Sequence, residues 1–287
     1  MSDTISWRQL WEETAAQHGR VHARWLCEEA SGAFDEEFDE ILDTGVTERS
    51  IAHLDSMLAR LATGEPLQYV LGHWSFRHLD LLVDRRVLIP RPETELVAEV
   101  AISLARELPR PVRAADLGTG SGAIGLSLLH EMPPGTVEVW LTDVSLDALD
   151  VARANAAGLG VKGAGARFAH GSWFEAVPDH LHESLALVVS NPPYVAHGDP
   201  AVDASVHEWE PAGALYSGDD GLDAVREVAS GAARWLQPGG WLVLEIGTGQ
   251  GQAVQRILET AGFTEVHIRA DLAGHDRIAV ARRPGSA

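Results

Sequence analysis

The chain has 287 residues, of which 45% are hydrophobic and 22% are charged, a formal net charge of −20 and a single cysteine. These values are ordinary for a globular protein with one large and one small domain. One cysteine excludes an internal disulfide and a cysteine-based zinc cluster. Phosphate backbones are bound mainly through Lys and Arg, so the acidic balance disfavours long nucleic acid as a substrate.

The sequence carries no signal for membranes or metals. No apolar run approaches the roughly 20 residues that a membrane-spanning helix requires. The first residues lack the basic and apolar regions of a signal peptide, and none of the 13 histidines shows metal-ligand spacing. We therefore expect a cytoplasmic protein that binds neither a membrane nor a metal.

The N-terminal quarter is expected to be helical. Apolar residues recur there at three- and four-residue spacing, and Thr47 stands before an amphipathic stretch as a helix cap would. Residues 1–71 are thus predicted to form a small helical bundle. Such a bundle either serves only as a self-contained folded domain or also recognises a partner.

Residues 72–90 are predicted to be a β-hairpin connector, because two short apolar segments flank a turn near Arg77. Pro92 suits the first turn of the next helix, and Glu93 and Glu95 favour its positive end. We expect the larger domain to span 91–287.

From residue 112 onward, predicted strands alternate with helices, which favours a parallel sheet covered on both faces. The strands are expected near 112–118, 136–143, 165–171, 185–190, 239–247, 263–270 and 277–283, and the helices near 122–130, 145–157, 220–236 and 250–261. The last two strands are joined by a loop too short for a parallel crossover, so they should be antiparallel.

A glycine-rich turn follows the first strand of this series, comprising Asp116, Leu117, Gly118, Thr119, Gly120, Ser121 and Gly122. Glycines there permit tight turning and close approach to a ligand. Asp143 ends the next strand, where a carboxylate can accept hydrogen bonds from both hydroxyls of a ribose. Strand, glycine turn, helix, strand and acid together predict a nucleotide-type cofactor site.

The choice of cofactor depends on Asp116. A carboxylate before the first glycine suits the cationic amino acid end of S-adenosylmethionine and would sit badly beside the pyrophosphate of NAD. Trp173 and Phe174 follow the third strand and can flank adenine or pack in the core. The residues favour S-adenosylmethionine.

The most informative segment is Asn191, Pro192, Pro193 and Tyr194, directly after the fourth strand. Asn191 offers a side-chain carbonyl, and the Pro192 carbonyl is a second acceptor with no N–H donor beside it. Both residues precede a proline and are therefore held extended. Two fixed acceptors and the Tyr194 ring match a planar –NH2 group, and we expect Asn191 to contact the methyl donor as well.

In these segments the chain resembles the release-factor glutamine methyltransferases, the HemK/PrmC family. The resemblance also rests on residues 64–72, on Leu88 to Glu95, and on Glu210, Pro211, Ala214 and Leu215. It implies a class I S-adenosylmethionine-dependent methyltransferase fold, Rossmann-like with a mostly parallel seven-stranded sheet, and an N-terminal helical domain that helps to bind class 1 peptide release factors. The implied reaction is methylation at N5 of the glutamine in their Gly-Gly-Gln loop.

The resemblance also implies the residues of each site. Those for the donor are Gly118, Thr119, Gly120, Ser121, Gly122, Asp143 and Trp173, and those for the glutamine are Asn191, Pro192, Pro193 and Tyr194. Ser172 departs from the family, because many relatives carry Asp there. Glu210 and Pro211 are either structural or part of the substrate crevice.

Two other functions remain open from the residues. An amino-methyltransferase acting on adenine or cytosine in DNA or RNA uses the same acceptor turn, although the net charge counts against it. An NAD-binding or nucleotide-sensing module would require the glycine loop alone. In the methyl-transfer reading, Asn191, Pro192 and Tyr194 act by orienting the nitrogen and stabilising its developing charge, and no side chain is an obvious base.

Overall fold

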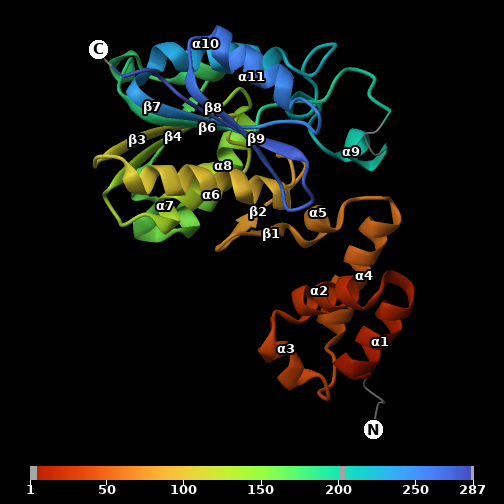
Figure 1. Ribbon diagram of the computed structural model, residues 1–287. Helices are drawn as coiled ribbons and strands as arrows, with labels where there is room; N and C mark the ends of the chain where they lie inside the picture. Colours follow the sequence, from red (N-terminus) through yellow and green to blue (C-terminus); the bar gives the residue numbers. More distant parts are fainter. Residues whose placement is uncertain (1–4, 201–203, 286–287) are drawn as a thin grey trace. The chain divides into compact units, whose positions relative to one another are not determined.

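The computed structural model describes residues 5–200 and 204–285. The chain divides into two compact units, Met1–Gly72 and His73–Ala287, drawn in Figure 1. Within the described ranges, no helix is both long enough and apolar enough to cross a membrane.

The first unit consists of short helices around one apolar core: α1 (Trp7–His18), α2 (Arg20–Ser31), α3 (Glu36–Ile41), α4 (Glu48–Ala62) and α5 (Leu67–Leu71). Helix α4 begins where the sequence predicted, since the Thr47 side chain accepts a hydrogen bond from the Ser50 N–H. Trp7 meets Phe38 edge to face in the core, with ring centroids 5.9 Å apart.

The second unit begins with the predicted hairpin, in which β1 (His73–Phe76) pairs antiparallel with β2 (Leu79–Leu82). Asn155 holds the hairpin to the rest of the unit. Its Oδ1 accepts from the Leu82 N–H at 2.7 Å, and its Nδ2 donates to the carbonyls of Leu82 and Ser121 at 3.1 and 2.8 Å. One buried carboxamide therefore ties the hairpin to the glycine turn.

The central sheet has seven strands in the order β5-β4-β3-β6-β7-β9-β8. Their bounds are β3 (Val112–Leu117), β4 (Val137–Asp143), β5 (Ala166–His170), β6 (Leu185–Ser190), β7 (Leu236–Glu245), β8 (Thr264–Ala270) and β9 (Asp276–Arg282). Strand β9 runs antiparallel to both of its neighbours, and the other pairs are parallel. The predicted fold class and the antiparallel final pair are confirmed.

Helices cover both faces of the sheet (Figure 1). On one face lie α6 (Pro92–Glu107) and α7 (Ala123–Glu131), with α8 (Leu146–Gly158) packed beside α7. On the other lie α10 (Asp223–Trp235) and α11 (Gly251–Thr260). The crossover β3–α7–β4 places the glycine turn at the carboxyl edge of the sheet, at the point between β3 and its other neighbour, β6, where the order of the strands reverses.

The structure departs from the sequence-based boundaries at several places, among them the start of α10, which is Asp223 and not 220. Strand β7 begins at Leu236, three residues before the expected start, because Leu236 pairs with Leu185 ahead of a register shift. The sequence did not indicate this start, because the Pro238-Gly239-Gly240 segment inside the strand is typical of a turn. Helix α9 (Ala204–Trp209) was not predicted, since six residues give too short a window for helical periodicity.

Candidate active site

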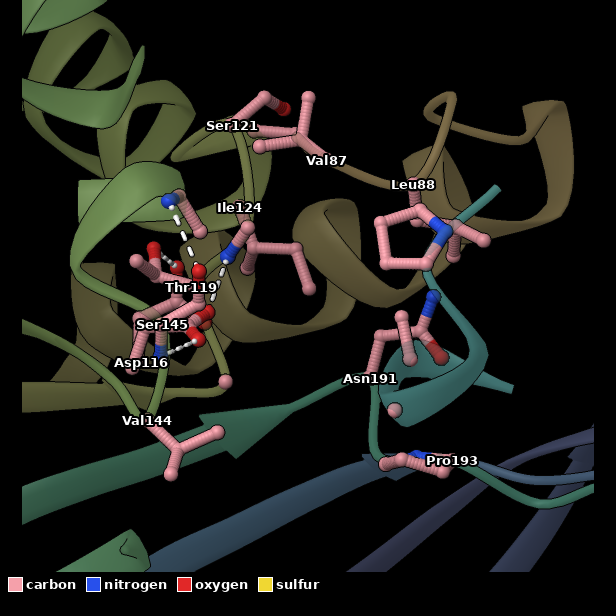
Figure 2. A pocket seen from close by; sticks show the side chains of 18 of the residues that line it. Val87, Leu88, Asp116, Thr119, Ser121, Ile124, Val144, Ser145, Asn191 and Pro193 are labelled. Atoms are coloured by element: carbon pink, nitrogen blue, oxygen red, sulfur yellow. Dashed lines mark hydrogen bonds between the residues drawn. The ribbon is translucent and has the colours of Figure 1, made fainter. Parts of the chain in front are cut away.

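A cavity of about 260 Å³ lies at the carboxyl ends of β3, β4 and β6. Figure 2 shows Asp116 and Thr119 on one side of it and Asn191 and Pro193 on the other. Nine of the twelve residues predicted for the cofactor and substrate sites line this cavity: Asp116, Gly118, Thr119, Gly120, Ser121, Asp143, Trp173, Asn191 and Pro193. The glycine turn and the acceptor turn, about 70 residues apart in sequence, thus face one space.

The glycine turn is built on left-handed backbone. Gly118, Gly120 and Gly122 have φ of 67°, 55° and 87°, a region that side chains with a Cβ rarely adopt. Gly122 is the N-cap of α7, and a Cβ there would lie 2.7 Å from Cδ1 of Leu126. The turn therefore requires glycine both for its conformation and for space.

Asp116 stabilises this turn through side-chain hydrogen bonds. Its Oδ2 accepts from the Thr119 hydroxyl at 2.6 Å and from the Gly125 N–H at 2.9 Å. The residue is only 1% exposed although it borders the cavity. Burial raises the pKa of the Asp116 carboxyl to about 6, against the opposing effect of the two hydrogen bonds. The contact of Asp116 with the amino acid end of the donor stays a prediction.

Asp143 lies at the tip of β4 and receives two backbone donors. Its Oδ2 accepts from the Gly120 N–H at 3.0 Å, and its Oδ1 accepts from the Ser145 N–H at 2.9 Å. Burial raises the pKa of Asp143, partly offset by these bonds. Each carboxylate oxygen keeps acceptor capacity, so the pair can also accept two hydroxyl groups of a ligand.

The two aromatic residues after β5 have different surroundings. Trp173 borders the cavity, and a Cβ on Gly118 would lie 3.5 Å from its ring. Its φ of 45° is left-handed, which is unusual for a residue with a Cβ. Phe174 instead stacks on Trp235 in the core at 5.9 Å. Of the pair, Trp173 is the residue placed to flank a planar ligand.

In the acceptor turn, Asn191 and Pro193 line the cavity, whereas Pro192 is buried and Tyr194 lies behind them. Among the described residues, no donor bonds to Oδ1 of Asn191 or to the Pro192 carbonyl. The Tyr194 carbonyl accepts from Nε2 of Gln250 at 3.0 Å, which fixes the far end of the turn. Gly122, Pro192 and Tyr194 are thus the predicted site residues that do not line the cavity.

Sequence reasoning missed a buried acid behind the acceptor turn. Glu245 is fully buried at the end of β7 and accepts from the Thr94 hydroxyl at 2.6 Å and from the Tyr194 hydroxyl at 3.2 Å. Burial raises its pKa to about 7. Thr94 belongs to the segment that carried the family resemblance, but nothing local to Glu245 distinguished it from other acids.

Another wall of the cavity comes from the segment between the hairpin and α6, through Arg86, Val87, Leu88 and Pro90. Glu210 holds this segment, because its carboxylate accepts from the Ile89 N–H and from the Arg91 guanidinium. Pro211, next to it, lines the cavity itself. Glu210 is therefore structural and Pro211 is part of the crevice, which separates the two roles that the sequence left open.

Comparison with known proteins agrees with this geometry. Residues 100–209 match the family described as "Methyltransferase small domain". The fold is shared with the 16S rRNA N2 G1207 methyltransferase of Thermus thermophilus, solved with AdoMet and guanosine (TM-score 0.52, 21% identity, 74% of this chain and 49% of that one).

Two curated relatives are much more similar in sequence. The release factor glutamine methyltransferase of Xylella fastidiosa (strain Temecula1) is 44% identical over 80% of this chain and 81% of its own. That of Burkholderia pseudomallei is 42% identical over 86% of this chain and 85% of its own. The chain is an enzyme of the family of release factor glutamine methyltransferases.

Proposed function

We propose that this enzyme transfers a methyl group from S-adenosylmethionine to the side-chain nitrogen, N5, of the glutamine in the Gly-Gly-Gln motif of class 1 peptide release factors. The observation that carries this proposal is the pair of acceptors on the Asn191 side chain and the Pro192 carbonyl. Neither has a protein donor among the described residues, and Asn191 faces the same cavity as the glycine turn.

The cavity residues fit the methyl donor. The left-handed glycines form a tight turn without side chains that a ligand can approach closely, whereas a Cβ at Gly118 would lie 3.5 Å from the Trp173 ring. The Asp143 carboxylate is held rigidly by the N–H groups of Gly120 and Ser145, and its remaining lone pairs suit the two ribose hydroxyls. When bound, S-adenosylmethionine supplies a methyl group activated by a positively charged sulfur.

The acceptor turn supplies orientation. An amide nitrogen is a weak nucleophile because its lone pair is delocalised into the carbonyl. Asn191 Oδ1 and the Pro192 carbonyl accept its two N–H bonds, which aims the nitrogen and stabilises the positive charge that develops on it. Holding two reactants in line can lower the barrier by up to about 7–11 kcal/mol.

The first unit, through residues 1–71, is proposed to recognise the release factor. Among its described residues, three large apolar side chains are exposed: Val21, Trp25 and Phe34, at 59%, 37% and 44%. The acidic residues Glu36, Glu37 and Asp39 stand in the first turn of α3. Exposed apolar side chains and an acidic helix start on the same unit suit a partner that offers apolar contacts and basic groups.

A methyl-transfer assay tests the proposal. Purified enzyme and labelled S-adenosylmethionine are incubated in parallel with a class 1 release factor, with duplex DNA and with RNA. We expect label in the release factor alone, and mass spectrometry should place a gain of one methyl group on the glutamine of the Gly-Gly-Gln peptide. Label in DNA or RNA with none in the release factor would overturn the proposal in favour of an amino-methyltransferase of nucleic acid.

A further inference from the structure

A continuous chain of hydrogen bonds leads from the cavity into the core of the larger unit. Nδ2 of Asn191 donates to Oγ1 of Thr94 at 3.3 Å, and Oγ1 of Thr94 donates to Oε2 of Glu245 at 2.6 Å. Thr94 is 4% exposed and Glu245 is fully buried. The three residues come from β7, from the first turn of α6 and from the turn after β6.

The number of protons available in this series of hydrogen bonds determines which group donates in each of them. A threonine hydroxyl has one proton, and the Thr94 hydroxyl uses it in the hydrogen bond that it donates to the Glu245 carboxylate. Toward Asn191, Oγ1 of Thr94 can therefore only accept a hydrogen bond. The partner it requires is the NH2 group of Asn191, which turns the carbonyl oxygen of the same carboxamide away from Thr94.

We propose that Thr94 and Glu245 are positioning residues that fix the Asn191 carboxamide with its NH2 group toward the protein and its oxygen toward the substrate nitrogen. The inference rests on the proposed function, and it explains how a side chain with two nearly isosteric ends presents only its acceptor to an –NH2 substrate. A reversed carboxamide would place the Asn191 NH2 group, a donor, against the –NH2 group of the substrate, which is also a donor.

Glu245 sets the direction only while it is ionised. A protonated Glu245 would donate to Thr94, and the Thr94 proton would then be free to bond to Oδ1 of Asn191, which reverses the carboxamide. The groups that face Glu245 are Tyr194, whose hydroxyl donates to Oε1, Arg277 on β9, whose charge favours ionisation, and Glu93 on α6, whose charge opposes it. Acidification should therefore lower turnover through this acid.

A matched pair of substitutions separates the hydroxyl from the shape of Thr94. Thr94→Val keeps the branched side chain and loses the hydroxyl, whereas Thr94→Ser keeps the hydroxyl. We expect kcat on the release factor to fall at least tenfold in Thr94→Val and less than threefold in Thr94→Ser, with the calorimetric Kd for S-adenosylmethionine within twofold of wild type in both. A Thr94→Val enzyme with wild-type kcat would overturn the inference.

A second measurement does not depend on turnover. In the ¹⁵N-labelled full-length protein, the side-chain NH2 resonances of Asn191 are assigned by their loss in Asn191→Ala and followed from pH 5 to 8. We expect them to shift with a single titration in the wild type and to stay constant in Glu245→Gln. Constant resonances in the wild type would overturn the inference, whereas absent methyl transfer with this titration intact would count against the proposed function alone.

Discussion

Arg91 and Glu210 form an ion pair across 119 residues of sequence, and the Glu210 side chain within it is almost completely buried. The other carboxylate oxygen of Glu210 accepts from the Ile89 N–H at 3.2 Å. The pair therefore fixes the segment before α6, which forms one wall of the cavity, against the turn after α9.

Glu210→Gln is expected to destabilise the protein by about 1–3 kcal/mol. A carboxamide has one acceptor oxygen, so one of the two donors held by Glu210 must lose its partner in a buried place. Urea unfolding measures the change in the free energy of unfolding. The matched control is Glu208→Gln, which alters an exposed side chain two residues away and should change that free energy by less than about 0.5 kcal/mol. Equal stability of the two variants would contradict the assigned role.

Gly125→Ala should also destabilise the protein, by about 1–3 kcal/mol, through overpacking. A Cβ at Gly125 would lie 2.9 Å from Oδ2 of Asp116 and 3.2 Å from Cδ2 of Leu141. Gly158→Ala is the control, because Gly158 ends α8 with nothing within 4 Å of its Cβ position. There we expect a neutral effect or a gain of up to about 1 kcal/mol. A Gly125→Ala protein as stable as Gly158→Ala would show that the residues around Gly125 move to accommodate the added methyl group without cost.

Asp143→Asn is expected to weaken binding of S-adenosylmethionine. Hydrogen bonds to a charged group contribute about 1.5–3 kcal/mol, so Kd should rise roughly 10- to 100-fold. Calorimetry provides the measurement, and Asp147→Asn is the control, since Asp147 is exposed in the first turn of α8 and undergoes the same change of charge. If both variants bound the donor like wild type, Asp143 would not be a ligand of the ribose.

The parts of the site that were predictable from sequence are those whose chemistry is local. The glycine turn, Asp143 and the acceptor turn each stand directly after a strand, and parallel strands bring their carboxyl ends to one edge. Periodicity and turn residues were therefore enough to place them in one cavity. The hairpin followed from two short strand-like segments, and the antiparallel strand β9 followed from the length of the loop before it.

The unpredicted parts depend on contacts between distant segments. Glu245 bonds to Thr94 across 151 residues, and Glu210 bonds to Ile89 across 121 residues. No window of sequence shows that a carboxylate will be buried, because burial comes from the packing of other elements. For the same reason, the residues themselves left open whether Trp173 or Phe174 faces the cavity, and only the family resemblance singled out Trp173, which lines it.

Asn191→Ala should lower kcat by about 10²–10³, the usual effect of removing one group that stabilises charge in a transition state. The Kd for S-adenosylmethionine should change far less than kcat, because the lost transition-state interaction is with the substrate nitrogen. Single-turnover kinetics with a release factor, together with calorimetry of the donor, separate the two effects. A variant with wild-type kcat would exclude the acceptor role of Asn191.

Glu245 should make the stability of the protein depend on pH. Burial raises its pKa from about 4.5 in the unfolded chain to about 7 in the folded one. Between these values the folded state binds more protons than the unfolded state, so stability is greatest at low pH and falls as pH rises through about 7. A shift of this size corresponds to about 3 kcal/mol.

Urea unfolding of wild type and Glu245→Gln at pH 5, 6, 7 and 8 isolates this effect, because other titrating groups contribute equally to both proteins. The free energy of unfolding of the wild type should decline relative to the variant as pH rises. Glu227→Gln, which changes an exposed acid on α10, should follow the wild-type curve at every pH. Parallel curves for the wild type and Glu245→Gln would mean that Glu245 ionises in the folded protein as readily as in the unfolded chain, and its hydrogen bonds would then have to offset the full cost of its burial.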